Sequence, residues 1–156
     1  MVTAQVLRGT ELFAGLSDAQ LQAIVELCRE ESREPGETIF VEGAEAKAVY
    51  LLLEGMVILR IQAGEREVMV RAIGNQGEVF GWSALVVPPR YTATAKCLEK
   101  SRVIAVDGSG LAALLDKDYS IGYPVMKRLA GIVTSRLKDT RSQLTSFLGR
   151  AIVTHG

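Results

Sequence analysis

The sequence predicts a mainly β fold, a roll, sandwich or barrel, with helices at both ends of the chain. Two observations support this prediction. Seven of the fifteen glycines fall between positions 36 and 81, where they separate short apolar or alternating runs at intervals of about ten residues. On either side of this segment, the apolar residues instead recur with helical spacing. At 156 residues, we expect a single domain that buries about 70% of its unfolded surface.

The first predicted element is a helix within residues 10–31. Ser17 is a suitable N-cap, because its hydroxyl can accept from an amide at the start of the helix. Leu12 and Phe13 precede the helix and are expected to pack against it. We assign residues 1–33 to an N-terminal helical segment. Its apolar side is formed by Leu21, Ile24, Val25, Leu27 and Cys28.

Strands are predicted from residue 34 to residue 107, where β-branched and alternating runs are bounded by glycines. The sequence AGE at 63–65 predicts a hairpin turn between two of these runs. The candidate strands are ETIFVEG, AVYLLLEG, MVILRIQ, EVMVRAI, YTATAKC and SRVIAVD.

Helical spacing returns after the strands, and we assign 108–150 to C-terminal helices and 151–156 to a tail. The segment GLAALLDKD predicts a short helix, and a long helix with one apolar stripe follows it. Such a stripe needs cover, either from the roll or from its copy in a second subunit. Its length favours a homodimer through residues 121–148. The stripe consists of Val125, Leu129, Ile132, Val133, Leu137, Thr140, Leu144 and Leu148.

Composition and spacing argue against several classes of protein. The 18 Lys and Arg residues are balanced by 18 Asp and Glu residues, so no basic field points to nucleic acid. No apolar run approaches the roughly 18 residues of a membrane span, and the N-terminus lacks a signal pattern. Cys28 and Cys97 are isolated, which indicates buried free thiols in a cytoplasmic protein. The single histidine, His155, is penultimate, so we expect no enzyme, metal or cofactor.

The segment REPGETIFVEGAEAKAVYLLLEGMVIL, residues 33–59, contains a PGE turn, an F-x-x-G turn and a Y-x-L-x-x-G hairpin. It resembles the first half of the cyclic nucleotide-binding domain family, and the order of elements is similar to that family from Leu12 to Arg150. The resemblance implies an eight-stranded antiparallel β-roll with a phosphate-binding cassette at residues 79–92. Catabolite-activator-like members carry a helix-turn-helix after the long helix. This chain has no room for one, so we expect no direct DNA binding.

The cassette sequence VFGWSALVVPPRYTATA suggests how an anion could be held. The first amides of a short helix lack carbonyl partners, so an anion can bind to the N–H groups of Ser83 and Ala84. Gly81 allows a close approach, because it has no Cβ. Arg90 could meet a phosphate with two parallel hydrogen bonds. The sequence therefore predicts a small anionic ligand, with cyclic AMP and cyclic GMP as candidates.

Two positions depart from the family pattern. Trp82 occupies the position of a glutamate whose carboxylate accepts from the ribose 2′-hydroxyl, and an indole has no acceptor. If the chain is aligned on Pro89, Arg90 faces the phosphate. If it is aligned on Ala93, Tyr91 faces the pocket and Arg90 points outward, because adjacent strand residues face opposite ways. The second alignment is slightly favoured.

Three interpretations therefore stay open. A different flat ligand stacks on Trp82 and Tyr91, or these rings fill the pocket and no ligand binds, or Arg90 holds a cyclic nucleotide. With a ligand, the chain is a stand-alone sensor that relays binding through the long helix to an unknown protein partner. Without one, it is a dimerisation or interaction module. The candidate site residues are Phe80, Gly81, Trp82, Ser83, Ala84, Arg90, Tyr91, Thr92, Arg136 and Thr140, the last at a position where catabolite-activator-like relatives present a threonine to the purine.

Overall fold

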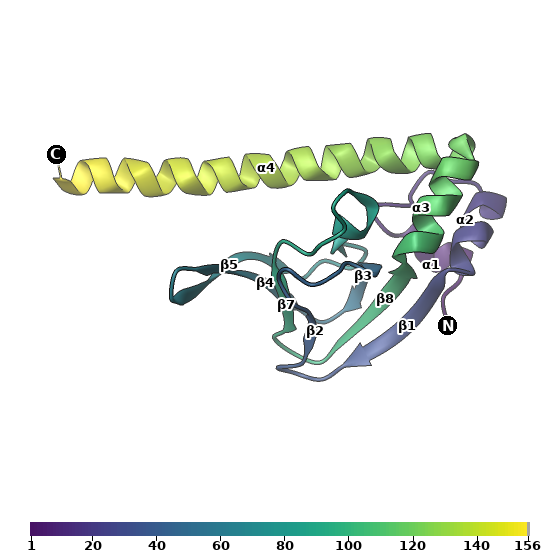
Figure 1. Ribbon diagram of the computed structural model, residues 1–156, viewed down its shortest axis with the longest axis horizontal. Helices are drawn as coiled ribbons and strands as arrows, with labels where there is room; N and C mark the ends of the chain where they lie inside the picture. The colour runs from purple at the N-terminus through teal and green to yellow at the C-terminus, as the bar shows by residue number, and fades with distance from the viewer. Residues whose placement is uncertain (156) are drawn as a thin grey trace.

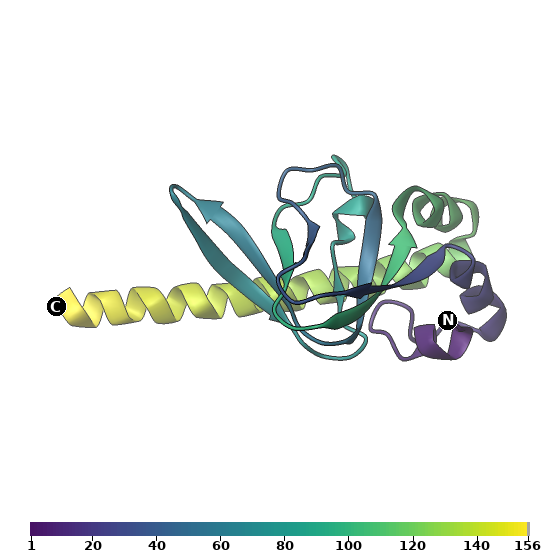
Figure 2. The same cartoon turned by 90° about the horizontal axis from the view of Figure 1, so that it is seen from below.

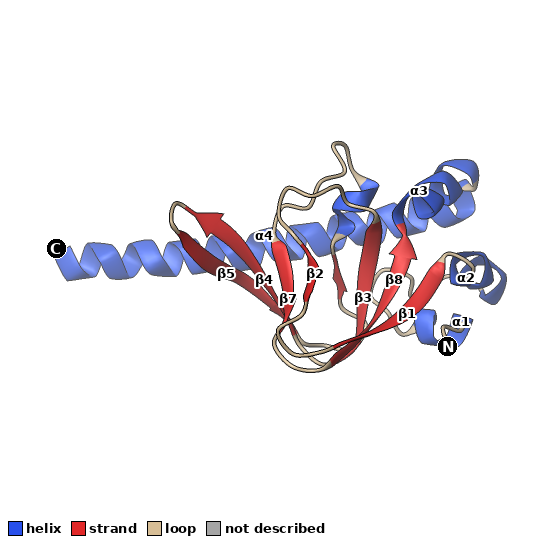
Figure 3. Cartoon of the chain, turned by 60° about the horizontal axis from the view of Figure 1, so that its bottom comes forward, coloured by secondary structure: helices blue, strands red, loops and turns tan. Residues whose placement is uncertain are grey.

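The computed structural model describes the backbone of residues 1–155 and the side chains of residues 1–150. Its strands form two four-stranded antiparallel sheets that together make a β-roll (Figure 3). The first sheet has the order β1-β8-β3-β6 and the second β2-β7-β4-β5. The predicted fold class is confirmed. The strands are β1 (Cys28–Arg33), β2 (Thr38–Phe40), β3 (Ala48–Glu54), β4 (Val57–Ala63), β5 (Arg66–Ile73), β6 (Val79–Phe80), β7 (Thr94–Cys97) and β8 (Ser101–Asp107).

Helices from both ends of the chain pack beside the roll (Figure 1). None of the helices in the described part of the chain combines the length and the apolar character required to cross a membrane. The short helix and the long helix predicted after the strands are both present. The helical elements are α1 (Ala4–Arg8), α2 (Asp18–Val25), the 3-10 turn η1 (Trp82–Leu85), α3 (Gly108–Lys117) and α4 (Tyr119–His155).

The N-terminal segment differs from the prediction in one respect. The helix begins after Ser17 as expected, and the Ser17 hydroxyl accepts from the Gln20 amide at 3.2 Å. However, it ends at Val25, and residues Cys28–Arg33 form β1 instead of a helical continuation. This strand lies at the edge of its sheet and pairs only with β8 along its whole length. Tertiary pairing at a solvated edge therefore overrides the helix propensity of its glutamates.

Apolar side chains form two cores. One lies inside the roll, and the other lies between the first sheet and the helices, where Leu12 and Phe13 are fully buried as predicted. Both cysteines are free thiols, Cys97 in the roll core and Cys28 half-buried beside α2. Burial raises the pKa of the Cys28 thiol to about 12 and also raises the pKa of Cys97. Both groups are therefore protonated and unreactive near neutral pH.

Helix α4 runs along the roll and continues well past it (Figures 1 and 2). Val125 and Leu129 are buried against the rest of the chain, but Val133, Leu137 and Leu144 are exposed. The predicted single stripe is therefore two stripes, because the helix presents one face to the roll and a different face to solvent. The helix also continues to His155, past the boundary predicted at 150, although the side chain of His155 lies outside the described residues.

Candidate functional site

The candidate site begins where β6 ends and the chain turns at Gly81. The φ angle of Gly81 is +74°, in the left-handed region that residues with a Cβ rarely adopt. A Cβ at this position would also lie 3.0 Å from the Phe40 ring and 3.3 Å from the rings of Tyr50 and Tyr91. Glycine is therefore favoured both by the backbone conformation and by the packed rings beside it.

The turn η1 follows Gly81 directly, so the short helix that the sequence predicts is present as a single 3-10 turn. Within residues 1–155, no group outside the turn accepts a hydrogen bond from the amides of Ser83 or Ala84. The first amides of a helical turn carry partial positive charge and favour an anion. The structure therefore contains the glycine-led turn on which the predicted anion site depends.

Tyr91 and other rings fill the space beside this turn. The Tyr91 ring stacks on Phe40 with 3.8 Å between ring centroids and 10° between planes, and the side chain is 5% exposed. Its hydroxyl donates to the carbonyl of Ala48 at 2.6 Å. Tyr50 and Phe80 extend the cluster at 5.4 Å between centroids. The cavity left beside η1 measures about 80 Å³, whereas small-molecule sites measure roughly 300–1,000 Å³.

Arg90 points away from this cavity. The Tyr91 amide donates to the Ala44 carbonyl at 3.0 Å, and the Tyr91 carbonyl accepts from the Gly43 amide at 2.8 Å. This ladder fixes the alternation of side chains, so that Tyr91 faces inward and Arg90 outward. The exposed guanidinium donates to the Gly43 carbonyl at 3.0 Å. Of the two alignments that the sequence left open, the structure has the second.

Burial raises the pKa of Tyr91 to about 12, which yields a prediction about alkaline stability. The folded pKa exceeds the ordinary value of about 10, so this contribution to stability is complete below pH 10 and is lost as the pH rises toward 12. We expect the free energy of unfolding to fall over this interval, and to fall less steeply in Tyr91→Phe. Chemical denaturation at a series of pH values measures both slopes. Equal slopes in the two proteins would contradict this assignment.

Trp82, the first residue of η1, is the cassette residue that contacts α4 through Arg136. The indole is half-buried, and the guanidinium carbon of Arg136 lies 6.0 Å from its ring centroid. One Arg136 nitrogen, Nη2, lies 3.0 Å from the Glu11 carboxylate and 3.3 Å from that of Glu78. Arg136 was predicted to contact a ligand. In the structure, its charge is instead paired with two carboxylates of the roll and the N-terminal segment.

Glu78 is a structural residue that the sequence did not indicate. Its carboxylate is 5% exposed, pairs with Arg71 at 3.2 Å, and accepts from the amides of Gly74 and Asn75 at 3.2 Å each. Arg71 also pairs with Asp139 of α4 at 3.0 Å. We call the group that attaches α4 to the roll through charges the polar junction. It consists of Glu11, Arg71, Glu78, Arg136 and Asp139.

Some of the remaining predicted site residues lie beside the cavity at η1, and others lie away from it. Phe80 is fully buried in the roll core, and Thr92 is exposed at the edge of the cavity. Thr140 is exposed, and its hydroxyl donates to the Arg136 carbonyl at 3.0 Å, one turn earlier. The structure brings Gly81, Trp82, Ser83, Tyr91 and Thr92 around the cavity and leaves Arg90, Arg136 and Thr140 outside it.

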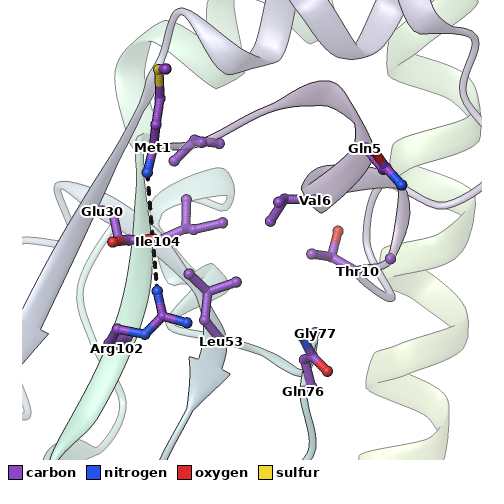
Figure 4. A pocket seen from close by; sticks show the side chains of 12 residues that line it. Met1, Gln5, Val6, Thr10, Glu30, Leu53, Gln76, Gly77, Arg102 and Ile104 are labelled. Carbon is purple, nitrogen blue, oxygen red and sulfur yellow. Dashed lines mark hydrogen bonds and ion pairs between the residues drawn. The ribbon is translucent and has the colours of Figure 1, made fainter.

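A second cavity of about 410 Å³ lies beside α1, against β1, β3 and β8 (Figure 4). Val6, Leu53 and Ile104 line it with apolar side chains. Glu30 and Arg102 line it with charges, and they pair with each other at 3.2 Å. This cavity combines residues that are far apart in the sequence, and no local pattern indicated it. Because Glu30 and Arg102 already neutralise each other, this cavity is a less favourable binding site for an anion than the cassette amides are.

A two-sheet roll with a glycine-led turn beside its core and a long helix behind it defines a class of regulatory ligand-binding domains. Residues 30–118 match the family model described as cyclic nucleotide-binding domain, which covers more than half of the chain. The chain belongs to this family.

Three relatives illustrate the likeness. The crystal structure of a candidate cyclic nucleotide-binding protein from Geobacter metallireducens is 32% identical with a TM-score of 0.79, over 88% of this chain and 99% of that chain. A candidate potassium channel protein of Rhodopseudomonas palustris is 28% identical over 77% of this chain and 29% of its own length. The Cyclic AMP receptor protein of Thermus thermophilus is 24% identical over 88% of this chain and 62% of its own. The chain thus spans less than two thirds of these two curated relatives.

Proposed function

We propose that this chain is a regulatory interaction domain whose roll keeps its nucleotide pocket closed and which acts by pairing with a second copy through α4. The observation that carries the first half is the position of Tyr91. Its ring stacks on Phe40, its hydroxyl is bonded to Ala48, and about 80 Å³ is left beside the cassette turn. The absence of a carboxylate at Trp82 and the outward direction of Arg90 remove both charged contacts that the family resemblance implies.

The exposed face of α4 supports the second half of this proposal. Nine exposed residues recur along it at alternating intervals of four and three, which is the heptad spacing of helices that pair. An apolar face of this length on a protein surface favours a partner. A second copy of the chain supplies a helix with the same length and period. We call this face the seam; it consists of Tyr119, Tyr123, Met126, Ala130, Val133, Leu137, Thr140, Leu144 and Phe147.

A second candidate function is supported by the amides of Ser83 and Ala84, which lie at the start of the turn η1. If Tyr91 leaves the cavity, these amides can receive the phosphate of a cyclic nucleotide or another small anion. The movement of the cassette would then alter how α3 and α4 pack, so that ligand binding and pairing are linked reciprocally. The name of the Thermus thermophilus relative makes cyclic AMP the first ligand to test.

A thermal-melt panel with cyclic AMP, cyclic GMP and other nucleotides separates the two candidates. We expect no shift for the wild-type chain, because its pocket is closed. A ligand at a hundredfold excess over its dissociation constant would add about 2.7 kcal/mol of stability, a shift of a few degrees. Such a shift would contradict the closed pocket and favour the sensor. Arg90→Ala is the matched control, since its guanidinium lies outside the cavity, and it should behave as the wild type does.

A further inference from the structure

A groove of about 680 Å³ opens between the segment that follows η1 and the corner where α3 meets α4. In Figure 1, the teal turn beneath α4 marks the cassette side of this region. Val87 is 95% exposed and Tyr123 is 70% exposed, both high values for large side chains of this kind. The groove is lined on its two long sides by Val86, Val87 and Pro89 and by Tyr119, Tyr123 and Met126.

The groove is continuous with the seam. Tyr119, Tyr123 and Met126 are the first three seam residues, so the start of the seam forms one wall of the groove. The segment 86–89 of the cassette forms the other wall. A helix that lies along the seam from its beginning must therefore also lie beside the cassette segment.

We propose that the first turns of the partner's α4 occupy this groove, so that the cassette segment of each copy packs on the helix of the other. This inference rests on the pairing through α4 proposed above. In a two-fold dimer, the same surface patch serves both copies and must fit itself. The start of α4 carries Tyr119 and Tyr123, which are 78% and 70% exposed. These two rings line the groove of their own copy and can also fill the groove of a second copy.

A second copy suits this groove better than an unrelated ligand does. The apolar surface does not end at the groove but continues as the seam to Phe147, beyond the roll. A small apolar molecule would cover the groove and leave the six later seam positions in water. A second α4 covers both at once, because it has the same heptad period over the same length. Pairing would thus also restrain the cassette segment that borders the closed pocket.

Cross-linking between two differently tagged chains tests this contact. One chain carries Val87→Cys and the other Tyr123→Cys, and the mixture is treated with a short bis-maleimide at neutral pH. The native thiols interfere little, because Cys97 is buried and burial raises the pKa of Cys28 to about 12. We expect a covalent product that contains both tags. The matched control replaces Val87→Cys with Leu98→Cys, which is 57% exposed and outside the groove, and should give no such product.

A third variant separates this inference from the pairing on which it rests. Leu137→Cys lies on the seam beyond the groove, and it should cross-link to itself across the two-fold axis. If Leu137→Cys cross-links and the Val87→Cys and Tyr123→Cys mixture does not, the copies pair but the groove is not occupied by α4. If neither cross-links, both the pairing and the groove inference are wrong. If the Leu98→Cys control reacts as strongly as Val87→Cys, the contact is not specific and the inference also fails.

Discussion

The substitution Glu78→Gln is expected to lower the free energy of unfolding by about 2–3 kcal/mol, a large effect for a change of one charge. The carboxylate is 5% exposed and pairs with both Arg71 and Arg136. Removing one partner from a buried ion pair typically costs about 3–5 kcal/mol, because the remaining charge is left without compensation. The cost is smaller here, because Arg71 also pairs with Asp139 and Arg136 also pairs with Glu11.

Chemical denaturation of the wild type and the variant at neutral pH measures this difference. The matched control is Glu67→Gln, which removes the same charge from a pair with Arg60 whose side chains are 46% and 40% exposed. Exposed pairs of this kind contribute about 0–1 kcal/mol. If the two substitutions cost the same, Glu78 does not act as the centre of the polar junction.

The polar junction also indicates how α4 is attached to the roll. Val125 and Leu129 hold the first turns of α4 by apolar burial. Arg136 and Asp139 lie further along and hold the helix through charges. The C-terminal end of the helix projects past the strands (Figure 2). The face of α4 that is bound to the roll and the face that forms the seam are therefore distinct.

Much of the fold is predictable from the sequence, because it is encoded in local patterns. The glycines between positions 36 and 81 separate the strands, Ser17 caps the second helix, and helical spacing returns after the last strand. The two missed strands lack such patterns. β1 is rich in charges because it lies at a solvated edge, and β6 is only two residues long, Val79–Phe80. Both depend on pairing with distant strands.

The candidate site was harder to predict for two reasons. The direction of Arg90 depends on the pairing of Tyr91 with Gly43 and Ala44, which lie almost fifty residues earlier in the chain. The polar junction joins residues 11, 71, 78, 136 and 139, and no single segment contains more than two of them. The turn at Gly81 was predictable, because adjacent residues create it.

The single apolar stripe predicted on the long helix shows a limit of periodicity. The positions of Val125, Leu129 and Val133 fit one helical stripe equally well in the sequence. In the structure, Val125 and Leu129 are buried, whereas Val133 is 41% exposed and belongs to the seam. A periodic pattern can indicate that a helix has apolar faces, but the place where the roll ends decides which residues remain uncovered.

The double substitution Leu137→Glu and Leu144→Glu is expected to convert the paired chain to a monomer. Both leucines lie on the seam, 57% and 56% exposed, and beyond the groove and the apolar cores. Fully burying a leucine contributes about 1.5–3 kcal/mol, and these side chains are already almost half covered, so each would contribute about 1 kcal/mol or more on pairing. The loss of four in a dimer then amounts to about 4 kcal/mol, about 10³-fold in the dissociation constant. Facing glutamates would add repulsion. Glutamate also forms helices well, so α4 itself should persist.

Sedimentation equilibrium over a range of protein concentrations measures this change, because it reports molecular mass without a shape assumption. The matched control is Ser142→Glu with Thr145→Glu, which adds the same two charges at exposed positions outside the seam. Because these positions face away from a helix lying on the seam, the control should keep the mass of the wild type. A wild-type chain that is already monomeric, or a seam variant that keeps the dimer mass, would contradict pairing through α4. In either case the exposed face from Tyr119 to Phe147 would need a different partner.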